Sequence, residues 1–330
     1  MPILEDDLRH VQGAKYFFSA DFLKGFWQCP IDPSSQHYFS FMTHPDVSTT
    51  PRQPQGAVDS PLYFHAQLSN IFRELIESKK MILWIDDVLL FANTWQEYMS
   101  IVKRFLDLCV EYNLQVNIKK TTLASTRATF CGRDITSTGI TYQARNTDTF
   151  RNMCEPVLAG DLSQFLMGIN WMRDSILNTS ADDSFASISA PLWRMLETVY
   201  TMSNSRKKQR YKNVRLSDCG WNATHSEAFA KLRDKLANQC IEQSFHIPGA
   251  KLCLFTDASD RFYSALLTQV VDWDPALSVH QQQHIPMATL SGEFRNSEVN
   301  WRIIEKEAYP LILALQQWEN LLLIPDGFHV

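Results

Sequence analysis

Residues 81–92 read Met-Ile-Leu-Trp-Ile-Asp-Asp-Val-Leu-Leu-Phe-Ala, so two adjacent carboxylates, Asp86 and Asp87, interrupt an otherwise apolar run. Apolar runs on both sides of a short acidic segment predict a β-hairpin with the aspartates at its turn. Buried flanks would hold both carboxylates at one rigid tip, where like charges repel each other unless cations neutralise them. Because Asp is also a common turn residue, two interpretations remain at this point: an ordinary acidic turn, or the tip of a metal site.

The composition excludes several classes of protein. The chain has 330 residues, of which 45% are hydrophobic and 20% charged, which is typical of a folded protein with two or three domains and not of a disordered one. No apolar run approaches the ~20 residues that span a bilayer, and the start of the chain is acidic where a signal peptide would be basic. We therefore expect a soluble intracellular protein, in the cytoplasm, the nucleus or both, with no membrane partner.

The cysteines indicate reduced thiols. There are seven, an odd number, and no two of them form a Cys-x-x-Cys pair, which argues against disulfides and against a zinc site. Four of them lie among apolar residues and are predicted to be buried: Cys29, Cys109, Cys131 and Cys253.

The net charge of −5 does not by itself favour nucleic-acid binding, which usually requires a basic face. The densest basic run covers residues 206–215 and lies in a polar stretch between Ser203 and Gly220. A solvated linker is one interpretation of this run; phosphate contact and a localisation signal are the others.

The chain mixes helical and strand-like segments on both sides of this basic run. Strands are predicted on either side of the acidic turn and over residues 15–21, 37–42, 128–132, 139–142, 251–257 and 265–270. Helices are predicted over residues 60–78, 95–112, 223–239 and 300–322, and 144–196 looks predominantly helical. Pro310 should kink the last helix or shift its start. The fold class is therefore predicted as α+β, without an internal repeat.

Several sequence motifs, in this order, carry a resemblance. Asp21–Gln28, Pro54-Gln55-Gly56 and Ile85-Asp86-Asp87 look like successive polymerase motifs of the reverse transcriptases of long-terminal-repeat retrotransposons, closest to the Ty3/gypsy group. Past the basic run, the segment from Trp221 through Glu227-Ala228-Phe229, then Thr256–Ser259 and Ile304–Ala308, is similar to the connection and RNase H region that follows the polymerase in those polyproteins.

The resemblance implies a domain order and an activity. The expected domains are a right-hand polymerase palm with incomplete fingers over residues 1–143, a helical thumb over 144–200, a basic linker and connection over 201–249, and a truncated RNase H-like α/β domain over 250–330. The implied activity is that of an RNA-directed DNA polymerase, a nucleotidyltransferase, within a retrotransposon polyprotein.

Polymerisation needs carboxylates that meet at one point. It is an in-line attack of a primer 3′-hydroxyl on the α-phosphate of a nucleotide, and two Mg²⁺ ions can assist both the attacking and the leaving oxygen. Asp21 ends the first predicted strand, and neighbouring strands of one sheet could bring it to the hairpin tip. By resemblance, Asp21 and Asp86 are the catalytic metal ligands and Asp87 supports them, with two Mg²⁺ expected per site and Mn²⁺ as a possible substitute. Without the resemblance, Asp21 could equally be an ordinary polar residue at a strand end.

The resemblance also implies nucleotide-binding residues. Phe26 would lie under the sugar and collide with a ribose 2′-hydroxyl, Gln55 and Gly56 would contact the nucleotide and template, and Lys120 loosely matches a lysine near the leaving pyrophosphate. A core aromatic and an ordinary polar turn residue are the alternatives for Phe26 and Gln55. The implied partners are an RNA template, a DNA primer, their RNA–DNA hybrid and deoxynucleoside triphosphates; nothing in the sequence indicates an oligomeric state.

RNase H chemistry also uses paired metals, here to hydrolyse the RNA strand of a hybrid. By resemblance, Asp257 and Glu307 are its first two catalytic metal ligands, although an Asp after a strand is more often a simple terminus. Glu305 would be solvated on another side of the same helix.

The sequence departs from the family pattern at several points. Trp84 stands where the family usually has Tyr, and the glycines expected after Thr256–Ser259 are replaced around residues 262–264. The chain opens almost at the palm, without the fingers segment that carries triphosphate-binding Lys and Arg, and it ends before the third RNase H aspartate. We therefore predict an inactive RNase H, with a non-catalytic remnant that at most binds nucleic acid as the alternative to an active polymerase.

Overall fold

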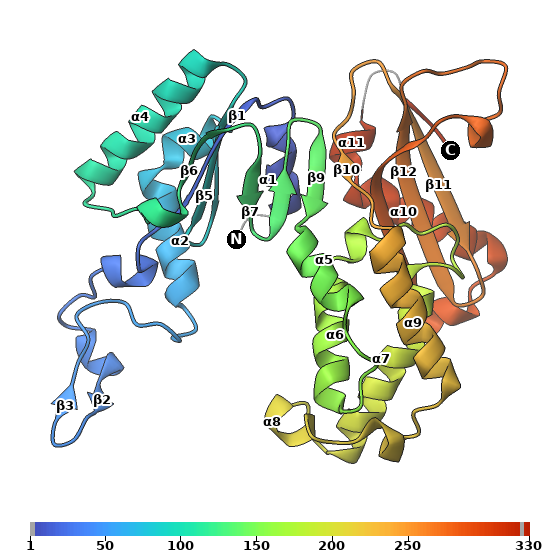
Figure 1. Ribbon diagram of the computed structural model, residues 1–330, viewed down its shortest axis with the longest axis horizontal. Helices are drawn as coiled ribbons and strands as arrows, with labels where there is room; N and C mark the ends of the chain where they lie inside the picture. Colours follow the sequence, from blue (N-terminus) through green and yellow to red (C-terminus); the bar gives the residue numbers. More distant parts are fainter. Residues whose placement is uncertain (1–3, 324–326) are drawn as a thin grey trace. The chain divides into compact units, whose positions relative to one another are not determined.

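The predicted acidic hairpin is present in the computed structural model, which describes residues 4–323 and 327–330 (Figure 1). Strand β4 (Met81–Trp84) pairs antiparallel with β5 (Asp87–Ala92), and Trp84 lies opposite Asp87. Strand β1 (Tyr16–Asp21) pairs with the other edge of β5, and β6 (Thr122–Ser125) completes a sheet of order β4-β5-β1-β6. The turn of the hairpin and the C-terminal end of β1 therefore lie at the same end of the strands of this sheet.

Helices pack on one face of the sheet because alternate strand residues are apolar. Helix α4 (Trp95–Glu111) begins at Thr94, whose hydroxyl accepts a hydrogen bond from the Glu97 N–H, and α2 (Ser60–Ile71) precedes the hairpin. The buried cluster between the sheet and these helices includes Phe18, Leu83, Leu90, Phe64, Phe72 and Phe105. On the opposite face Phe17, Ile82 and Leu89 are buried as well, so the strands have a buried layer on both sides.

The chain divides into two compact units, Met1–Gly139 and Ile140–Val330. The remaining elements of the first unit are α1 (Leu4–Leu8), β2 (Phe41–Met42), β3 (Val47–Ser48), α3 (Arg73–Glu77), β7 (Ala128–Phe130) and β8 (Arg133–Ile135), with β9 (Gly139–Tyr142) at the boundary. None of the helices within the described ranges combines the length and the apolar character that a bilayer crossing requires.

Two elements of the first unit differ from the prediction. The strand predicted over residues 37–42 is a short 3₁₀ turn, Gln36–Phe39, followed by the two residues of β2. Its aromatic side chains are exposed at Tyr38 and Phe41, so no buried face selects an extended conformation. The helix predicted over 60–78 is broken at Phe72, whose ring is fully buried.

The first part of the second unit is a helical bundle with its own core. It contains α5 (Ala144–Arg151), α6 (Ala159–Trp171), α7 (Phe185–Met202), α8 (Lys208–Tyr211) and α9 (Ala223–Asn238). Residues of α6, α7 and α9 share one buried cluster, in which the rings of Phe165 and Phe229 lie 4.5 Å apart.

The basic run packs onto this bundle, which corrects its interpretation as a solvated linker. Tyr211 is buried, and its hydroxyl lies 2.9 Å from that of Ser163 on α6. Leu216 is also buried in the same cluster. Lys212 and Arg215, which lie between these two residues, are exposed. The charged residues therefore predicted a linker, although the two apolar residues fix the segment to the bundle.

The C-terminal part of the second unit is a four-stranded sheet of order β13-β12-β11-β14. Its strands are β11 (Lys251–Ala258), β12 (Phe262–Val270), β13 (Ile285–Glu293) and β14 (Phe328–His329), preceded by β10 (Gln243–Ser244). Helix α10 (Ile303–Gln317) and the short α11 (Glu319–Leu322) pack on one face, where Ala314 and Trp318 join Leu252 and Leu254 in a buried cluster. Pro310 lies within α10 without ending it. The α+β class is confirmed.

All seven cysteines are free thiols, as predicted. Cys109 and Cys253 are buried, but Cys29 and Cys131 are only half-buried. Cys131 is exposed to this extent because β7 ends at Phe130 and Cys131 forms the following turn.

Candidate active site

Asp21 and Asp87 lie directly opposite each other across the β1–β5 pair, as the last residue of one strand and the first of the next. Backbone hydrogen bonds hold both strand ends: the Phe22 N–H donates to the Asp86 carbonyl at 3.1 Å, and the Asn117 N–H donates to the Asp21 carbonyl at 2.9 Å. The structure thus brings Asp21 to the adjacent pair Asp86 and Asp87, from which it is distant in the sequence.

The hairpin turn has an unusual backbone. Ile85 has φ of +57°, a left-handed conformation that is unfavourable for a β-branched residue. Its N–H donates to Nδ1 of His65 on α2, with 3.4 Å between the nitrogens. This contact helps to fix the residue that directly precedes Asp86.

The charges at this end of the sheet shift the pKa values of Asp87 and Lys120. Burial, together with the negative charges of Asp86 and Asp21, raises the pKa of Asp87 to about 6. The Lys120 ammonium acts in the opposite direction, and it lies 2.6 Å from Oδ2 of Asp21. The hydrogen bond to Asp21 in turn raises the pKa of Lys120. Lys120, which only loosely matched the family pattern, is therefore in direct contact with the predicted site.

A cavity of about 250 Å³ opens beside these side chains, and the turn between β7 and β8 forms part of its wall. This turn consists of Cys131 and Gly132, both with positive φ, as in a two-residue hairpin connection. Burial raises the pKa of the Cys131 thiol to about 12, so its S–H donates to the Asp87 carboxylate, with 3.8 Å between sulfur and oxygen. The sequence did not predict that these two residues lie at the site, although a glycine between two short strand-like runs is typical of a turn.

These side chains fit a divalent cation by their chemistry. Carboxylate oxygens are the ligands that Mg²⁺ prefers, and the raised pKa of Asp87 reports a repulsion that a cation would relieve. The ammonium of Lys120 already supplies one positive charge at Asp21. Within the part of the chain that the structure describes, no three carboxylate, imidazole or thiol side chains are gathered closely enough to form a finished metal site.

Phe26 lies close to the hairpin through its neighbour Gly25. A Cβ on Gly25 would be 3.4 Å from the Cβ of Asp86 and 3.1 Å from the ring of Phe64. Phe26 is half-buried, and its ring packs edge-on against Phe64 with 5.4 Å between the centroids. The turn after β1 is thus pressed against both the hairpin and α2.

Gln55 and Gly56 are exposed in a turn before α2, where Gly56 has φ of +93°. The turn is fixed by Gln53, which is buried and donates from Nε2 to the Ser60 carbonyl at 2.8 Å, while the Ser60 hydroxyl donates to the Pro54 carbonyl. Gln53 was not predicted, because a polar residue two positions before a turn gives no signal of burial.

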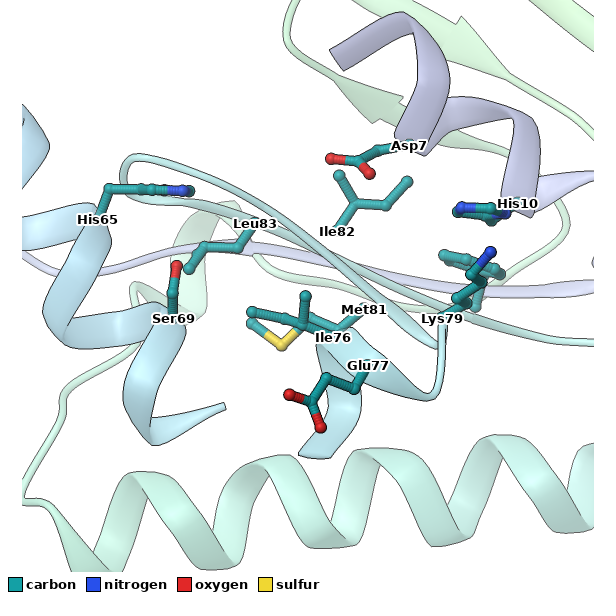
Figure 2. A pocket seen from close by; sticks show the side chains of 11 residues that line it. Asp7, His10, His65, Ser69, Ile76, Glu77, Lys79, Met81, Ile82 and Leu83 are labelled. Atoms are coloured by element: carbon teal, nitrogen blue, oxygen red, sulfur yellow. The ribbon is translucent and has the colours of Figure 1, made fainter. Parts of the chain in front are cut away.

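A second cavity, of about 380 Å³, lies at the β4 edge of the sheet (Figure 2). Met81, Leu83 and Ile76 form its apolar part, and polar groups surround them, among them Asp7 and Glu77. None of the residues predicted for the active site lines it. Its link to the hairpin turn is His65, whose ring both borders the cavity and accepts the Ile85 N–H.

The structure does not bring Asp257 and Glu307 together. Oδ2 of Asp257 accepts a hydrogen bond from the Ala181 N–H at 2.6 Å. Leu252 and Leu254 face α10, so strand alternation puts Asp257 on the opposite face of the sheet. Glu307 is exposed on α10, and its neighbour Lys306 turns inward to bind Asp260.

Comparison with known proteins gives two separate family matches. Residues 3–142 match the family model for reverse transcriptase (RNA-dependent DNA polymerase), and residues 221–330 match that for an RNase H-like domain found in reverse transcriptase. The Transposon Tf2-3 and Tf2-7 polyproteins of Schizosaccharomyces pombe (strain 972 / ATCC 24843) are each 24% identical over 322 residues, which is 98% of this chain but 22% of theirs. The chain therefore spans about a fifth of the length of these relatives.

Solved structures confirm the fold. The foamy viral protease-reverse transcriptase in complex with dsDNA matches with a TM-score of 0.71 at 21% identity, over 97% of this chain and 60% of that one. The same protein in complex with an RNA/DNA hybrid matches with a TM-score of 0.70 at 22% identity, over 95% and 38%. The predicted palm-type fold followed by an RNase H-like domain is thus confirmed. The two family matches, their order and the transposon relatives identify this chain as the reverse transcriptase and RNase H-like domains of a retrotransposon polyprotein.

Proposed function

We propose that this chain is an active RNA-directed DNA polymerase that extends a DNA primer on an RNA template by two-metal nucleotidyl transfer. The observation that carries the proposal is the cross-strand pair of Asp21 and Asp87, with Asp86 at the adjoining turn. An ordinary acidic turn would not need a third carboxylate from another strand. Here burial, and then the charges of Asp86 and Asp21, raise the pKa of Asp87 to about 6.

Asp21, Asp86 and Asp87 would hold two Mg²⁺ ions, or Mn²⁺ in their place. When bound, these ions activate the attacking 3′-hydroxyl and stabilise the leaving oxygen. The carboxylates fix the position of the reacting groups, because they sit at the ends of buried strands. Lys120 has a long and exposed side chain, so its ammonium can move from Asp21 to the charge that develops on the leaving pyrophosphate.

The nucleotide would bind beside the turn that follows β1. We assign Phe26 to the sugar, where a flat ring excludes a ribose 2′-hydroxyl, and Gln55 with Gly56 to the nucleotide and template. Support for Phe26 comes from its packing on Phe64, which leaves the ring little freedom to move aside. Deoxynucleoside triphosphates are therefore the proposed substrates.

The nucleic-acid partners follow from the same comparisons. Foamy viral relatives of this fold were solved with dsDNA and with an RNA/DNA hybrid, and we extend both ligands to this chain. The domain assignment that accompanies this proposal is palm over 1–143, thumb over 144–200, connection over 201–249 and RNase H-like domain over 250–330. For that last domain we propose no cleavage of RNA, although Asp257 and Glu307 match the catalytic positions.

Primer extension on an RNA template tests the polymerase. With Mg²⁺ and deoxynucleotides, the wild-type chain should extend the primer, and Asp86→Asn should lower the rate by roughly 100-fold or more. Asp107→Asn, on the exposed side of α4, is the matched control and should retain the wild-type rate. If the wild-type chain extends no faster than Asp86→Asn, the chain is a non-catalytic remnant.

A further inference from the structure

The face of the C-terminal sheet opposite α10 is covered by the segment of residues 178–187, which leads into α7. Hydrogen bonds join this segment to strands β13 and β11. Nδ2 of Asn178 donates to Oγ1 of Thr289 at 2.6 Å, the Ala181 N–H donates to Asp257 at 2.6 Å, and the Ala186 N–H donates to Oγ of Ser291 at 3.2 Å. Since Asp257 and Ser291 both lie opposite Ser264 in the strand register, these contacts share one face of the sheet.

Helix α9 also binds this segment, through Lys235. Lys235 is only 2% exposed, and its ammonium donates to Oδ2 of Asp183 at 2.8 Å and to the Leu177 carbonyl at 3.2 Å. Burial alone would raise the pKa of Asp183, but hydrogen bonds from Lys231 and Lys235 outweigh it and hold this pKa well below its usual range. The segment therefore presents the Ala181 N–H to the sheet in a fixed position.

The surroundings of Asp257 do not suit a metal. One of its two carboxylate oxygens is already engaged at 2.6 Å, and the carboxylate that should share the metal, Glu307, belongs to the helix on the other face. Lys306 beside it is buried and binds Asp260, which fixes the rotation of α10 about its axis. Asp257 thus already has a structural partner in the segment of residues 178–187.

We propose that Asp257 is a structural acceptor and not a metal ligand: its carboxylate binds the Ala181 N–H and clamps the helical bundle to the RNase H-like sheet. A hydrogen bond from a backbone N–H to an ionised carboxylate is among the strong ones in proteins. The RNase H-like sheet then serves as a rigid support for the bundle. This role does not depend on the polymerase activity proposed above, and failure of primer extension would leave it unaffected.

Amide exchange and thermal unfolding of the whole chain, with and without Mn²⁺, test this role. Asp257→Ala should speed exchange of the Ala181 amide by about tenfold or more and lower the unfolding temperature of the second unit by roughly 3–6 °C. Glu307→Gln is the matched control, because it removes the other matched carboxylate from an exposed site; it should change neither quantity. Added Mn²⁺ should shift the wild-type chain and Glu307→Gln by the same small amount.

A metal site would give the opposite pattern. Mn²⁺ would raise the unfolding temperature of the wild-type chain, both Asp257→Asn and Glu307→Gln would abolish that rise, and the Ala181 amide would stay protected in Asp257→Asn. That result overturns the proposal. If Asp257→Ala does not fold, two milder variants decide it: Asp257→Asn, which replaces the charged acceptor by a weaker neutral one, and Thr289→Val, which removes the Asn178 contact. Faster exchange confined to residues 178–187 in both supports the clamp, and unchanged exchange in both contradicts it.

Discussion

Asp87 lies opposite Asp21 and next to Asp86, so folding places three like charges at one end of the sheet. Its pKa is raised to about 6 by burial and by those two charges. The folded chain therefore binds a proton at Asp87 more tightly than the unfolded chain does. The stability that this group contributes is fully present below about pH 4 and is lost as the pH rises through about 6.

Asp87→Asn should accordingly stabilise the protein at neutral pH. We expect its free energy of unfolding to exceed that of the wild-type chain by about 1 kcal/mol, after allowance for partial exposure of the carboxylate. The difference should vanish by about pH 4, where the wild-type side chain is protonated as well. Urea unfolding of both chains across this range, without divalent cations, measures it; a variant that is less stable at neutral pH would contradict the assigned repulsion.

At this scale the sequence predicted the carboxylates but not their surroundings. Asp21 and Asp86 could be paired because each ends an apolar run, and the resemblance supplied their order. Lys120, Cys131 and Gln53 reach the site or its turns through contacts that depend on tertiary packing, which no local pattern records. Asp257 matched a motif, yet its actual partner is a backbone N–H from another segment.

Among the elements, the turn after β1 and α2 together support the hairpin. Gly25 is packed between the Phe64 ring and Asp86, at distances where an added methyl group would press on both. The ring of Phe64 is fully buried, and the ring of Phe26 packs edge-on against it. Any displacement of Phe64 is thus transmitted to the proposed nucleotide site.

Gly25→Ala should reduce primer extension and destabilise the chain by about 1–2 kcal/mol, because the new methyl group forces the Phe64 ring or the hairpin to move. Phe64→Leu removes ring atoms and should restore part of the activity when combined with Gly25→Ala. Extension rates and urea unfolding of the two single variants and the double variant check this. A double variant whose losses simply add would show that the methyl group does not act through Phe64.

Periodicity was sufficient to predict most elements, including the hairpin, α4, α9 and β11, but strand β13 was not predicted. It did not predict elements whose conformation depends on a partner elsewhere. Residues 37–42 look strand-like, but no long strand lies beside them and they form a 3₁₀ turn with a two-residue strand. The basic run gave a linker signal, and only the packing of Tyr211 against α6 shows that it belongs to the bundle.

For the whole molecule, the two units have separate cores. Leu90 of β5 is fully buried between its sheet and the helices of the first unit, and Leu232 is fully buried in the helical bundle. The buried cluster that contains Leu90 lies within residues 1–139, and the one that contains Leu232 lies within residues 140–330. Chains built from separate cores often unfold in more than one step.

Calorimetry of the intact chain should therefore show two transitions. Leu90→Ala and Leu232→Ala should each destabilise one unit by about 2–5 kcal/mol, because each leaves a cavity in a single core. Each variant should lower one transition temperature and leave the other in place. If both variants lower the same transition, or if only one is seen, the two units fold as one cooperative body.

The register of β1 against β5 also determines which kinds of sequence change keep Asp21 and Asp87 opposite each other. Six consecutive residue pairs, from Tyr16 with Ala92 to Asp21 with Asp87, set that register. Replacing side chains along these strands leaves the pairing intact, whereas inserting or deleting one residue within either strand turns all later side chains to the opposite face. A chain can thus drift to 24% identity with its transposon relatives and keep its carboxylate pair, but one lost codon within β1 would separate them.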